Sequence, residues 1–470
     1  MRITQVKRLS TIDALRVHLD ELGVTIPIAD EVDPHGPLAS PLTITDGSAG
    51  ALSVPNRFAV LPMEGWDGTT DGRPTDLVRR RWGRFATSGC GLVWGEATAV
   101  RRDGRANAHQ LVLDETTVDE IAALRALLAP DQVAGLQLTH SGRFSRPEGA
   151  PLPRTAYVHP VLDARVGATP ADVFDDDELD ELADQYVAAA VLADQAGFAF
   201  VDIKHCHGYF LHELLSSYDR VGRYGGDLTG RTHFLRRVVA GIRAAAPGLA
   251  LAMRLSLFDL MPYTPGAGGV GVPDPAGSTP YRYAFGGDGS GLGIDLTETH
   301  ALLDLLDELG IGLVSATAGS PYYNPHVQRP AYFPPSDGYQ PPEDPLVGVA
   351  RQLAATAEVT ARHPNLVVIG SGYSYLQDWV AHVGQAVLAT GGASMIGLGR
   401  MVLSYPDLPV DVFAGRALQT RMICRTFSDC TTAPRNGLVS GCFPIDPFYK
   451  EHPQRVELTR AKRAAKEQRR

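Results

Sequence analysis

The stretch ELDELADQYVAAAVLADQAGFAFVDIK, residues 178–204, decides the fold. Its first part, 178–197, carries apolar residues at helical spacing and ends in a glycine, which predicts an amphipathic helix. Its last part, 199–204, is a short apolar run that is typical of a parallel strand buried on both faces. A helix that leads directly into such a strand is the repeating unit of an α/β fold.

The same unit recurs along the chain. A second helical pattern, TGRTHFLRRVVAGIRAAAPG, covers 229–248, with Thr229 as the expected N-cap. Seven further apolar runs are similar to 199–204: Phe58–Met63, Gly91–Ala97, Val133–Thr139, Leu249–Leu255, Ile311–Thr317, Leu366–Gly370 and Met395–Gly399. Eight alternations of strand and helix predict a closed (β/α)8 TIM barrel rather than an open sheet.

Three segments follow from this pattern. We expect an N-terminal extension over 1–50, a barrel over 51–420 and a C-terminal extension over 421–470. Within the barrel, 261–293 and 319–346 are rich in Gly and Pro and follow the fifth and sixth strands. Loops in that position lie on the catalytic face of a barrel, so both are expected to shape a substrate pocket.

The composition is that of an ordinary globular protein. Of its 470 residues, 44% are hydrophobic and 20% are charged, and the net charge of −10 argues against nucleic acid or an anionic membrane as a partner. No run of 18 apolar residues occurs, and the first residues lack an apolar core of signal-peptide length. Five cysteines do not form an even disulfide framework, so we expect a cytoplasmic protein.

The carboxyl ends of the expected strands carry the polar residues. Chemistry in a TIM barrel takes place at these ends. Glu64 follows the first run, the fourth leads into Lys204-His-Cys-His-Gly-Tyr209, and Arg254 ends the fifth. Gly372, Gly399 and Arg400 follow the seventh and eighth runs. Glycines let backbone N–H groups approach an anion and arginine adds a bidentate contact, so the sequence predicts a phosphate site there.

Seven fragments occur in the order known from one family and cover roughly residues 50–415. They are NRFAVLPM, GLVWGEATAV, LQLTHSGR, HGYFLHELLSS, RYGGDLTGR, MRLSLFD and IGLGRMVLSYPD. Together they resemble the old yellow enzyme family of NADH:flavin oxidoreductases, and in particular the barrel part of its larger members, of the dienoyl-CoA reductase and trimethylamine dehydrogenase type. The resemblance implies a TIM barrel that binds FMN and uses NADH or NADPH. It also implies a small-molecule substrate such as an α,β-unsaturated carbonyl compound, and a homo-oligomer.

The resemblance also implies a role for each matching residue. Arg254 would lie near flavin N1 and O2, where a guanidinium stabilises the charge of the reduced flavin. His207 would polarise the substrate oxygen, and Tyr209 would deliver a proton to the α-carbon. The remaining cofactor contacts would come from Pro62, Met63 and Ala97 at the flavin ring, Gln137 at the pyrimidine edge, and Gly372, Gly399 and Arg400 at the phosphate.

Two residues depart from the family pattern. Lys204 stands where the family has a histidine, so either Lys204 or His205 takes that donor position. A lysine would favour an anionic or strongly polarised substrate oxygen. Glu64 stands where the family has a small thiol or hydroxyl beside the flavin, and it could pair with Lys204. From the second long loop, Tyr322, Tyr323, Asn324 and His326 are further candidates to contact the substrate.

The C-terminal cysteines resemble the four-cysteine [4Fe–4S] motif of the larger family members. Cys424, Cys430 and Cys442 keep a similar spacing, but Phe427 stands where a further cysteine would be. Cubane clusters usually take four thiolates, so no normal cluster is expected. Those members also continue into a nucleotide-binding domain, which the residues after Cys442 are too few to form, so NAD(P)H would reduce FMN at the barrel mouth.

Other functions remain open from the sequence. Lys204 at a barrel mouth beside a phosphate site could form a Schiff base, as in a lyase or aldolase. A partner protein rather than NAD(P)H could supply the electrons. His205, His207 and His212 could bind a metal, although the family pattern does not require one.

Overall fold

Eight parallel strands form a closed barrel in the computed structural model, which describes residues 3–47, 49–277 and 279–468. Each of the eight apolar runs overlaps one strand, so the predicted (β/α)8 fold is confirmed. The order around the barrel is β10-β11-β12-β3-β4-β5-β6-β7. The strands are β3 (Phe58–Val60), β4 (Leu92–Ala99), β5 (Val133–Thr139), β6 (Phe200–Ile203), β7 (Ala250–Ser256), β10 (Leu313–Thr317), β11 (Val367–Gly370) and β12 (Met395–Leu398).

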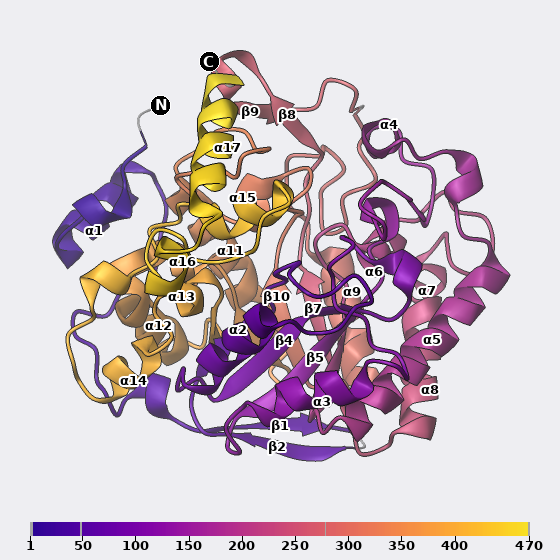
Figure 1. The fold of residues 1–470 in the computed structure, drawn as a ribbon, viewed down its shortest axis with the longest axis horizontal. Helices are drawn as coiled ribbons and strands as arrows, with labels where there is room; N and C mark the ends of the chain where they lie inside the picture. Colours follow the sequence, from indigo (N-terminus) through magenta and orange to yellow (C-terminus); the bar gives the residue numbers. More distant parts are fainter. Residues whose placement is uncertain (1–2, 48, 278, 469–470) are drawn as a thin grey trace.

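Helices surround the barrel and cover its outer face (Figure 1). The covering helices are α2 (Asp76–Ala86), α3 (Val118–Ala126), α5 (Asp176–Gln195), α8 (His233–Ala245), α9 (Thr297–Glu308), α11 (Pro345–Arg362), α12 (Val380–Ala389) and, after β12, α13 (Arg400–Ser404) and α14 (Leu408–Phe413). Their apolar faces pack on the outward side chains of the strands, which explains why the strand runs read as continuously apolar.

The two helices expected first start where capping chemistry allows. The Asp175 side chain accepts from the backbone N–H of Glu178, and the Glu178 carboxylate accepts from the N–H of Asp175. This capping box fixes the start of α5. The second pattern begins earlier than expected, with a short α7 (Leu228–Arg231) capped by Asp227. Thr229 lies inside α7 and is therefore not the N-cap.

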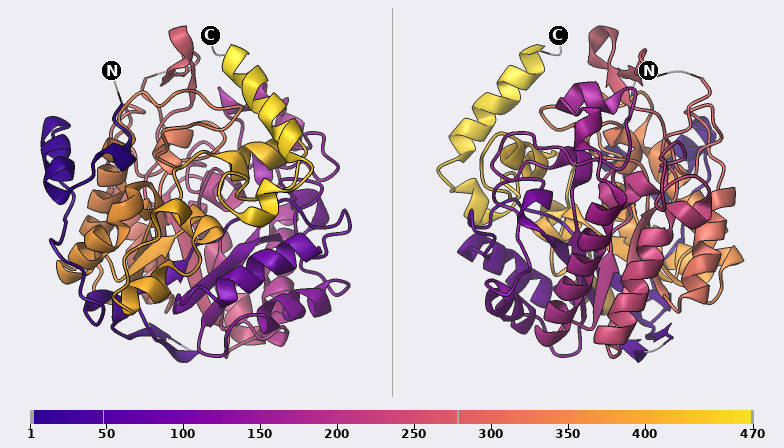
Figure 2. Two further views of the ribbon diagram at one scale, coloured as in Figure 1. Left: turned by 60° about the vertical axis from the view of Figure 1, so that its left-hand side comes forward. Right: turned by 90° about the vertical axis from the view of Figure 1, so that its right-hand side faces the viewer.

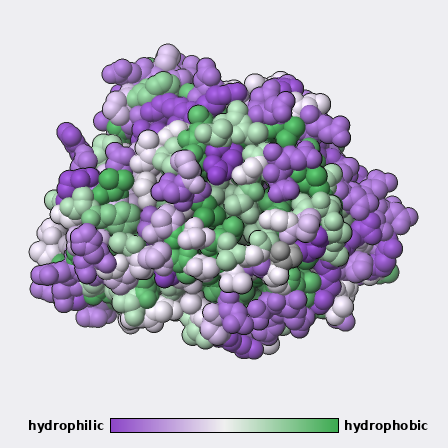
Figure 3. All heavy atoms as spheres, turned by 90° about the horizontal axis from the view of Figure 1, so that it is seen from below, coloured by the Kyte–Doolittle hydropathy of each residue, from purple (hydrophilic) through white to green (hydrophobic). Residues whose placement is uncertain are grey.

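A two-stranded hairpin closes the amino-terminal end of the barrel. Strands β1 (Leu42–Asp46) and β2 (Gly50–Val54) pair antiparallel and cross the expected boundary at residue 50. Ile44 and Val54 pack with apolar side chains from inside the barrel. The hairpin lies at the bottom of Figure 1, and the surface seen from that side mixes hydrophobic with hydrophilic residues (Figure 3). This end of the barrel is a packed floor.

The N-terminal segment lies against the side of the barrel, and the C-terminal segment lies over its mouth (Figures 1 and 2). Helix α1 (Ile12–Glu21) precedes the hairpin, and Trp379 Nε1 donates to the carbonyl of Leu9 at 3.0 Å. The C-terminal segment folds into α15 (Asp429–Arg435), α16 (Pro447–Lys450) and α17 (Arg455–Gln468). Among the described residues, no helix is both long and apolar enough to cross a membrane.

Asp202 joins three strands inside the barrel. Its carboxylate accepts from Trp94 Nε1 on β4 at 2.9 Å, from Gln137 Nε2 on β5 at 2.5 Å and from the backbone N–H of Arg254 on β7 at 2.8 Å. Burial raises the pKa of Asp202 to about 6, although the three donors oppose this shift. The carboxyl group therefore fixes the strand that carries Arg254 at the cost of burying a charge.

The raised pKa of Asp202 predicts a pH-dependent stability. Because the folded state holds this proton up to about pH 6, the group contributes stability that is complete below about pH 4 and is lost as the pH rises to about 6. In Asp202→Asn this contribution disappears. The difference in unfolding free energy between wild type and Asp202→Asn should fall with rising pH across that window, by at most about 1.4 kcal/mol per pH unit. Urea unfolding from about pH 4 to 7 measures it, and a constant difference would contradict the assignment.

Candidate active site

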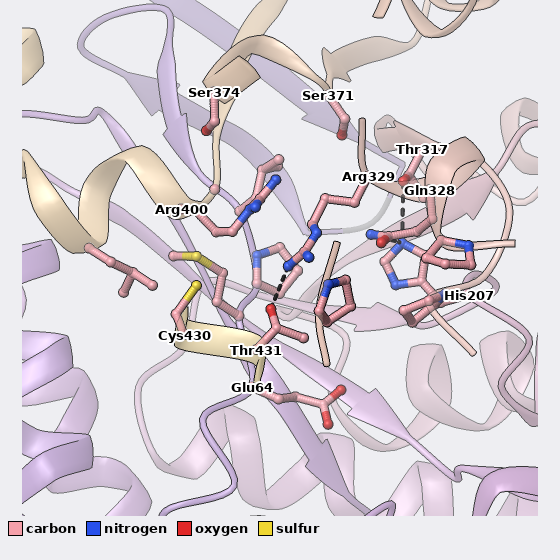
Figure 4. Close-up of a pocket in the computed structure, with 18 of the residues that line it drawn as sticks. Glu64, His207, Thr317, Gln328, Arg329, Ser371, Ser374, Arg400, Cys430 and Thr431 are labelled. Carbon is pink, nitrogen blue, oxygen red and sulfur yellow. Dashed lines mark hydrogen bonds between the residues drawn. The ribbon is translucent and has the colours of Figure 1, made fainter. Parts of the chain in front are cut away.

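One cavity opens at the carboxyl ends of the strands (Figure 4). Its lining comes from the ends of β3, β6, β7, β10, β11 and β12, from the loop after β10, and from the C-terminal segment. The structure brings eleven of the predicted site residues together here: Pro62, Met63, Glu64, Lys204, His207, Tyr209, Arg254, Tyr322, Gly372, Gly399 and Arg400. Residues almost 340 positions apart in the chain therefore line one site.

Two predicted flavin contacts lie beside the cavity rather than in its lining. Ala97 on β4 and Gln137 on β5 are partners in register, and both are buried. The Gln137 amide N–H donates to Asp202, so this side chain is held within the barrel. Neither role at the flavin ring is tested by these positions, and both remain predictions.

The choice between Lys204 and His205 has a structural answer. Lys204 lines the cavity, whereas His205 does not. The His205 ring is buried, and its Nδ1 lies 2.7 Å from the carbonyl oxygen of Ile203. Burial lowers the pKa of His205 to about 4, so the ring is neutral. The structure therefore does not support His205 as a substrate contact.

Three loop residues expected near the substrate instead hold their own loop together. Tyr323 Oη donates to Asp259 at 2.5 Å, and Asn324 Nδ2 donates to the same carboxylate at 2.7 Å. His326 Nδ1 lies 2.7 Å from Tyr339 Oη. None of the three lines the cavity. We expected Tyr323, Asn324 and His326 to contact the substrate, but the structure places them inside the loop instead. Buried polar groups of a long loop need hydrogen-bond partners of their own.

The two long loops, 261–293 and 319–346, differ in whether they line the cavity. The loop after β10 supplies Pro321, Tyr322, Gln328 and Arg329 to the lining. None of the described residues of 261–293 lines it. That loop forms a small hairpin of β8 (Tyr263–Pro265) and β9 (Gly271–Pro273) at the top of Figure 1. Only the second loop shapes the pocket as expected.

Glu64 is the hydrogen-bonding centre of one end of the cavity. Its carboxylate accepts from Lys204 Nζ at 3.1 Å, from Trp66 Nε1 at 2.9 Å, and from Tyr209 Oη at 3.3 Å to each oxygen. Lys204 Nζ also lies 3.5 Å from the centre of the Tyr209 ring. Tyr322 Oη lies 3.0 Å from Tyr209 Oη. Because Glu64 pairs with Lys204, the lysine offers the substrate no unbalanced charge.

The turn that carries Glu64 is supported by a buried ion-pair network. Arg81 Nη1 lies 2.7 Å from Asp67, and Arg81 Nη2 lies 3.0 Å from Glu96. Although burial opposes its charge, these two carboxylates raise the pKa of Arg81 well above its ordinary value. A Cβ at Gly65 would lie 2.3 Å from Arg81 Nη1, so only glycine fits there. Trp66 next to it has φ of 50°, a strained conformation for a bulky residue.

The segment 204–209, which follows β6, turns sharply at its end. His207 and Gly208 both have positive φ, 67° and 75°, and the backbone N–H of Gly208 donates to His212 Nδ1 at 2.8 Å. This turn brings His207 to the cavity, where its Nε2 lies 3.2 Å from Thr317 Oγ1. Burial, with the charges of Arg254 and Lys204, lowers the pKa of His207 well below its ordinary value. His207 is therefore a neutral hydrogen-bonding group.

Tyr209 stays protonated. Burial raises its pKa well above the ordinary value, and the charge of Glu64 adds to this effect. A phenol beside a carboxylate keeps its proton because a second negative charge there is unfavourable. Tyr209 can thus donate a proton across the physiological pH range without itself titrating.

The opposite end of the cavity is suited to an anion. Gly372 has φ of 94°, which favours glycine, and a Cβ at Gly399 would meet no atom within 4 Å, so the approach to that backbone is open. Arg400 Nη1 and Ser371 Oγ are buried and have no hydrogen-bond partner among the described residues. Arg254 Nε is likewise without a partner, and Arg254 Nη1 donates to the carbonyl of Pro62 at 3.2 Å. These orphaned donors fit a phosphate at one end of a bound flavin and its polar ring edge near Arg254.

The three C-terminal cysteines are free thiols near the same end. Cys424 is buried, and Cys430 lines the cavity. The Phe427 ring stacks on Phe333 with centroids 5.6 Å apart. Within the described residues, no group of three or more His, Cys, Asp and Glu side chains is placed to hold a metal ion. That finding concerns the geometry without ligands, so the expectation about an iron–sulfur cluster stays a prediction.

Comparison with known proteins finds flavin-dependent relatives. Residues 38–270 match the NADH:flavin oxidoreductase / NADH oxidase family. An NADH:flavin oxidoreductase of Gibberella zeae is 27% identical over 243 residues, which are 48% of this chain and 57% of that protein. The NADPH dehydrogenase of Bacillus subtilis is 25% identical over 374 residues, covering 78% of this chain and 92% of that enzyme. These matches show that the chain is similar to NADH:flavin oxidoreductases, the old yellow enzyme family that the sequence resembles.

A solved structure supports the fold assignment. The 2-naphthoyl-CoA reductase complexed with 2-naphthoyl-CoA superposes with a TM-score of 0.68 at 17% identity. The match covers 89% of this chain and 58% of the reductase. The chain thus spans little more than half the length of this reductase and of the fungal relative. At such identity the match shows the fold alone.

Among the cavity residues that the sequence did not predict are Trp66, Gln328 and Arg329. Trp66 lies in the turn after Glu64, which has no motif, and Gln328 and Arg329 lie in the Pro- and Tyr-rich loop after β10. Arginine without a nearby acidic residue in a Pro-rich loop was the available signal for Arg329. Contacts of this kind depend on how the loop folds back, which a local pattern does not reveal.

The Glu64–Lys204 pair predicts a clear coupling between substitutions. Glu64→Gln or Lys204→Met alone leaves the other charge partly buried without its partner, so each should lower the unfolding free energy by about 1–3 kcal/mol. The double variant should lose less than the sum of the two, by about 1 kcal/mol or more. Urea unfolding of the four proteins at neutral pH measures this coupling. Strict additivity would mean that the pair contributes no mutual stabilisation.

Proposed function

We propose that this protein is an FMN-dependent oxidoreductase that takes electrons from NADH or NADPH and reduces a small organic substrate, or oxidises it in reverse. The observation that carries the proposal is the single cavity with a neutral hydrogen-bonding end around His207 and Tyr209 and an anion-binding end at Gly372, Gly399 and Arg400. The match of residues 38–270 to the NADH:flavin oxidoreductase / NADH oxidase family supports it. The most suitable substrate is an α,β-unsaturated carbonyl compound.

The residues of the cavity are suited to hold FMN. Arg254 would meet the N1 and O2 edge, Pro62 and Met63 would lie against the ring, and Arg400 with the two glycines would hold the phosphate. When bound, FMN supplies a hydride acceptor and donor at its N5 atom. Arg254 brings a buried guanidinium to the place where negative charge develops, which favours the reduced cofactor.

His207 and Tyr209 are the side chains that act on the substrate. The neutral His207 ring hydrogen-bonds the carbonyl oxygen and draws charge away from the β-carbon that receives the hydride. The Tyr209 hydroxyl turns from Glu64 to the α-carbon and gives up its proton. Tyr322 can return a proton to Tyr209 because the two hydroxyls lie 3.0 Å apart. Hydride and proton together complete the addition of two hydrogen atoms across the double bond.

The ion pair argues against the competing lyase. A Schiff base requires a free lysine amine, whereas Lys204 Nζ is paired with the Glu64 carboxylate at 3.1 Å. The pair also modifies the expectation from the sequence that Lys204 favours an anionic substrate oxygen, because Glu64 already balances its charge. Delivery of electrons by a partner protein stays a second candidate, and homo-oligomer formation and a cytoplasmic location are further proposals.

The absorption spectrum of the purified protein tests the proposal. Twin flavin bands that bleach when NADH or NADPH is added anaerobically are expected. Flavin bands that neither nucleotide bleaches would favour a partner protein as the electron source. A colourless protein that does not take up added FMN would overturn the proposal, and borohydride trapping of substrate on Lys204 would then identify a lyase.

Tyr209→Phe separates the two half-reactions. Flavin reduction by NAD(P)H needs no proton from this residue and should stay within about twofold of wild type. Reoxidation by an unsaturated carbonyl substrate should slow by about 100-fold, the usual contribution of a general acid. Anaerobic stopped-flow absorbance follows both steps. Equal slowing of both half-reactions would remove Tyr209 from the role of proton donor.

A further inference from the structure

The cations of the cavity divide into two groups. Among the residues that line it, Arg81, Lys204 and Arg435 form ion pairs with carboxylates. Three others form no ion pair with any described carboxylate: Arg254, Arg329 and Arg400. Arg254 lies at the β7 end of the cavity beside Pro62. The other two leave a surplus of positive charge at the anion-binding end.

Arg329 and Arg400 interact with each other. Burial lowers the pKa of Arg329 well below its ordinary value, and the charge of Arg400 lowers it further. Figure 4 shows both side chains in the cavity, between Ser374 and Thr431. Two half-buried guanidinium groups without an anion repel each other and lose part of the hydration of free ions. Such an arrangement is favourable when an anion binds to both.

The described part of the chain offers no such anion. Cys424 is close enough for its charge state to depend on both arginines, but burial raises the pKa of this thiol, which therefore stays neutral. The contacts of the Arg329 guanidinium are two hydroxyl groups. Arg329 Nη2 donates to Ser428 Oγ at 3.0 Å, and Nη1 donates to Thr431 Oγ1. Hydroxyl oxygens orient a guanidinium without cancelling its charge.

These hydroxyls come from a segment outside the barrel. Ser428 is the residue before α15 and has φ of 63°, and Thr431 lies in the first turn of that helix. Arg329 itself lies just after α10 (Pro325–Gln328) in the loop after β10. The C-terminal segment therefore fixes an arginine of a barrel loop at the anion-binding end. Two of the five N–H groups of the guanidinium are used in this way, and three remain.

We propose that Arg329 and Arg400 bind one phosphate dianion together, and that this phosphate belongs to the flavin cofactor. The inference rests on the proposed function and adds Arg329, with its supports Ser428 and Thr431, to the binding site. A phosphate monoester is doubly charged near neutral pH and accepts bidentate bonds from guanidinium groups, so it matches two unpaired arginines beside Gly372 and Gly399. The C-terminal segment is then a part of the cofactor site.

Flavins with and without the phosphate test the proposal. Flavin-free protein is titrated with FMN and with riboflavin, and the quenching of flavin fluorescence gives both dissociation constants. Arg329→Met should raise the Kd for FMN by about 10- to 100-fold and leave that for riboflavin within about twofold. Arg329→Lys should lie between these values. Ser428→Ala combined with Thr431→Val should raise the Kd for FMN by a smaller factor.

Arg435→Met is the matched control. Arg435 lines the same cavity, but its charge is balanced by Asp337, so the ratio of the two dissociation constants should not change. Inorganic phosphate should compete with FMN for the wild-type protein and not with riboflavin. The riboflavin constant also reports whether each variant is folded.

The outcomes separate the two proposals. A wild-type protein that binds neither flavin overturns the proposed function and this inference with it. If the wild type binds FMN more tightly than riboflavin but Arg329→Met keeps the same ratio, only the inference fails. If Arg329→Met instead changes the preference for NADPH over NADH in the flavin-loaded protein, the dianion is the nucleotide's phosphate and the assignment to the flavin is wrong.

Discussion

Closure of the eight-stranded sheet is the constraint on which the site depends. The last strand pairs with the first, Leu398 opposite Val60, and the parallel register directs every carboxyl end to the same mouth. Asp202 strengthens this closure from within by accepting donors from β4, β5 and β7. A barrel that closes in one register fixes where each strand-end residue lies. The cavity therefore contains residues from nearly the whole length of the chain.

This constraint explains what the sequence could predict. Parallel strands buried on both faces leave continuous apolar runs, which is why all eight strands were located from the sequence. Once the strands are known, residues at their carboxyl ends must meet, and Lys204, Arg254 and Arg400 do line one cavity. The sequence raised a pairing of Glu64 with Lys204, 140 residues away, but could not establish it, because a contact at that separation depends on side-chain rotamers.

Barrel closure does not fix the positions of loop residues in this way. Tyr322 and Tyr323 are adjacent and chemically alike, yet one reaches the cavity and the other donates to the buried Asp259. The difference depends on an acidic residue more than 60 positions earlier in the chain, which no local pattern connects to the loop. Arg329 was missed for the converse reason, since its supports lie about 100 residues later. Long-range partners decide which loop residues are structural and which are available for binding.

The two ends of the cavity differ in their charge. At one end, Glu64 balances Lys204, burial keeps His207 neutral, and Tyr209 keeps its proton, so this end presents hydrogen bonds without net charge. At the other end, the half-buried Arg329 and Arg400 have no carboxylate partners among the described residues. A molecule with an uncharged polar ring at one end and a dianion at the other fits only one way round. A reversed molecule would place its dianion at the end without net charge and leave the arginines at the other end without an anion, so electrostatics favours one orientation of the cofactor before any specific contact forms.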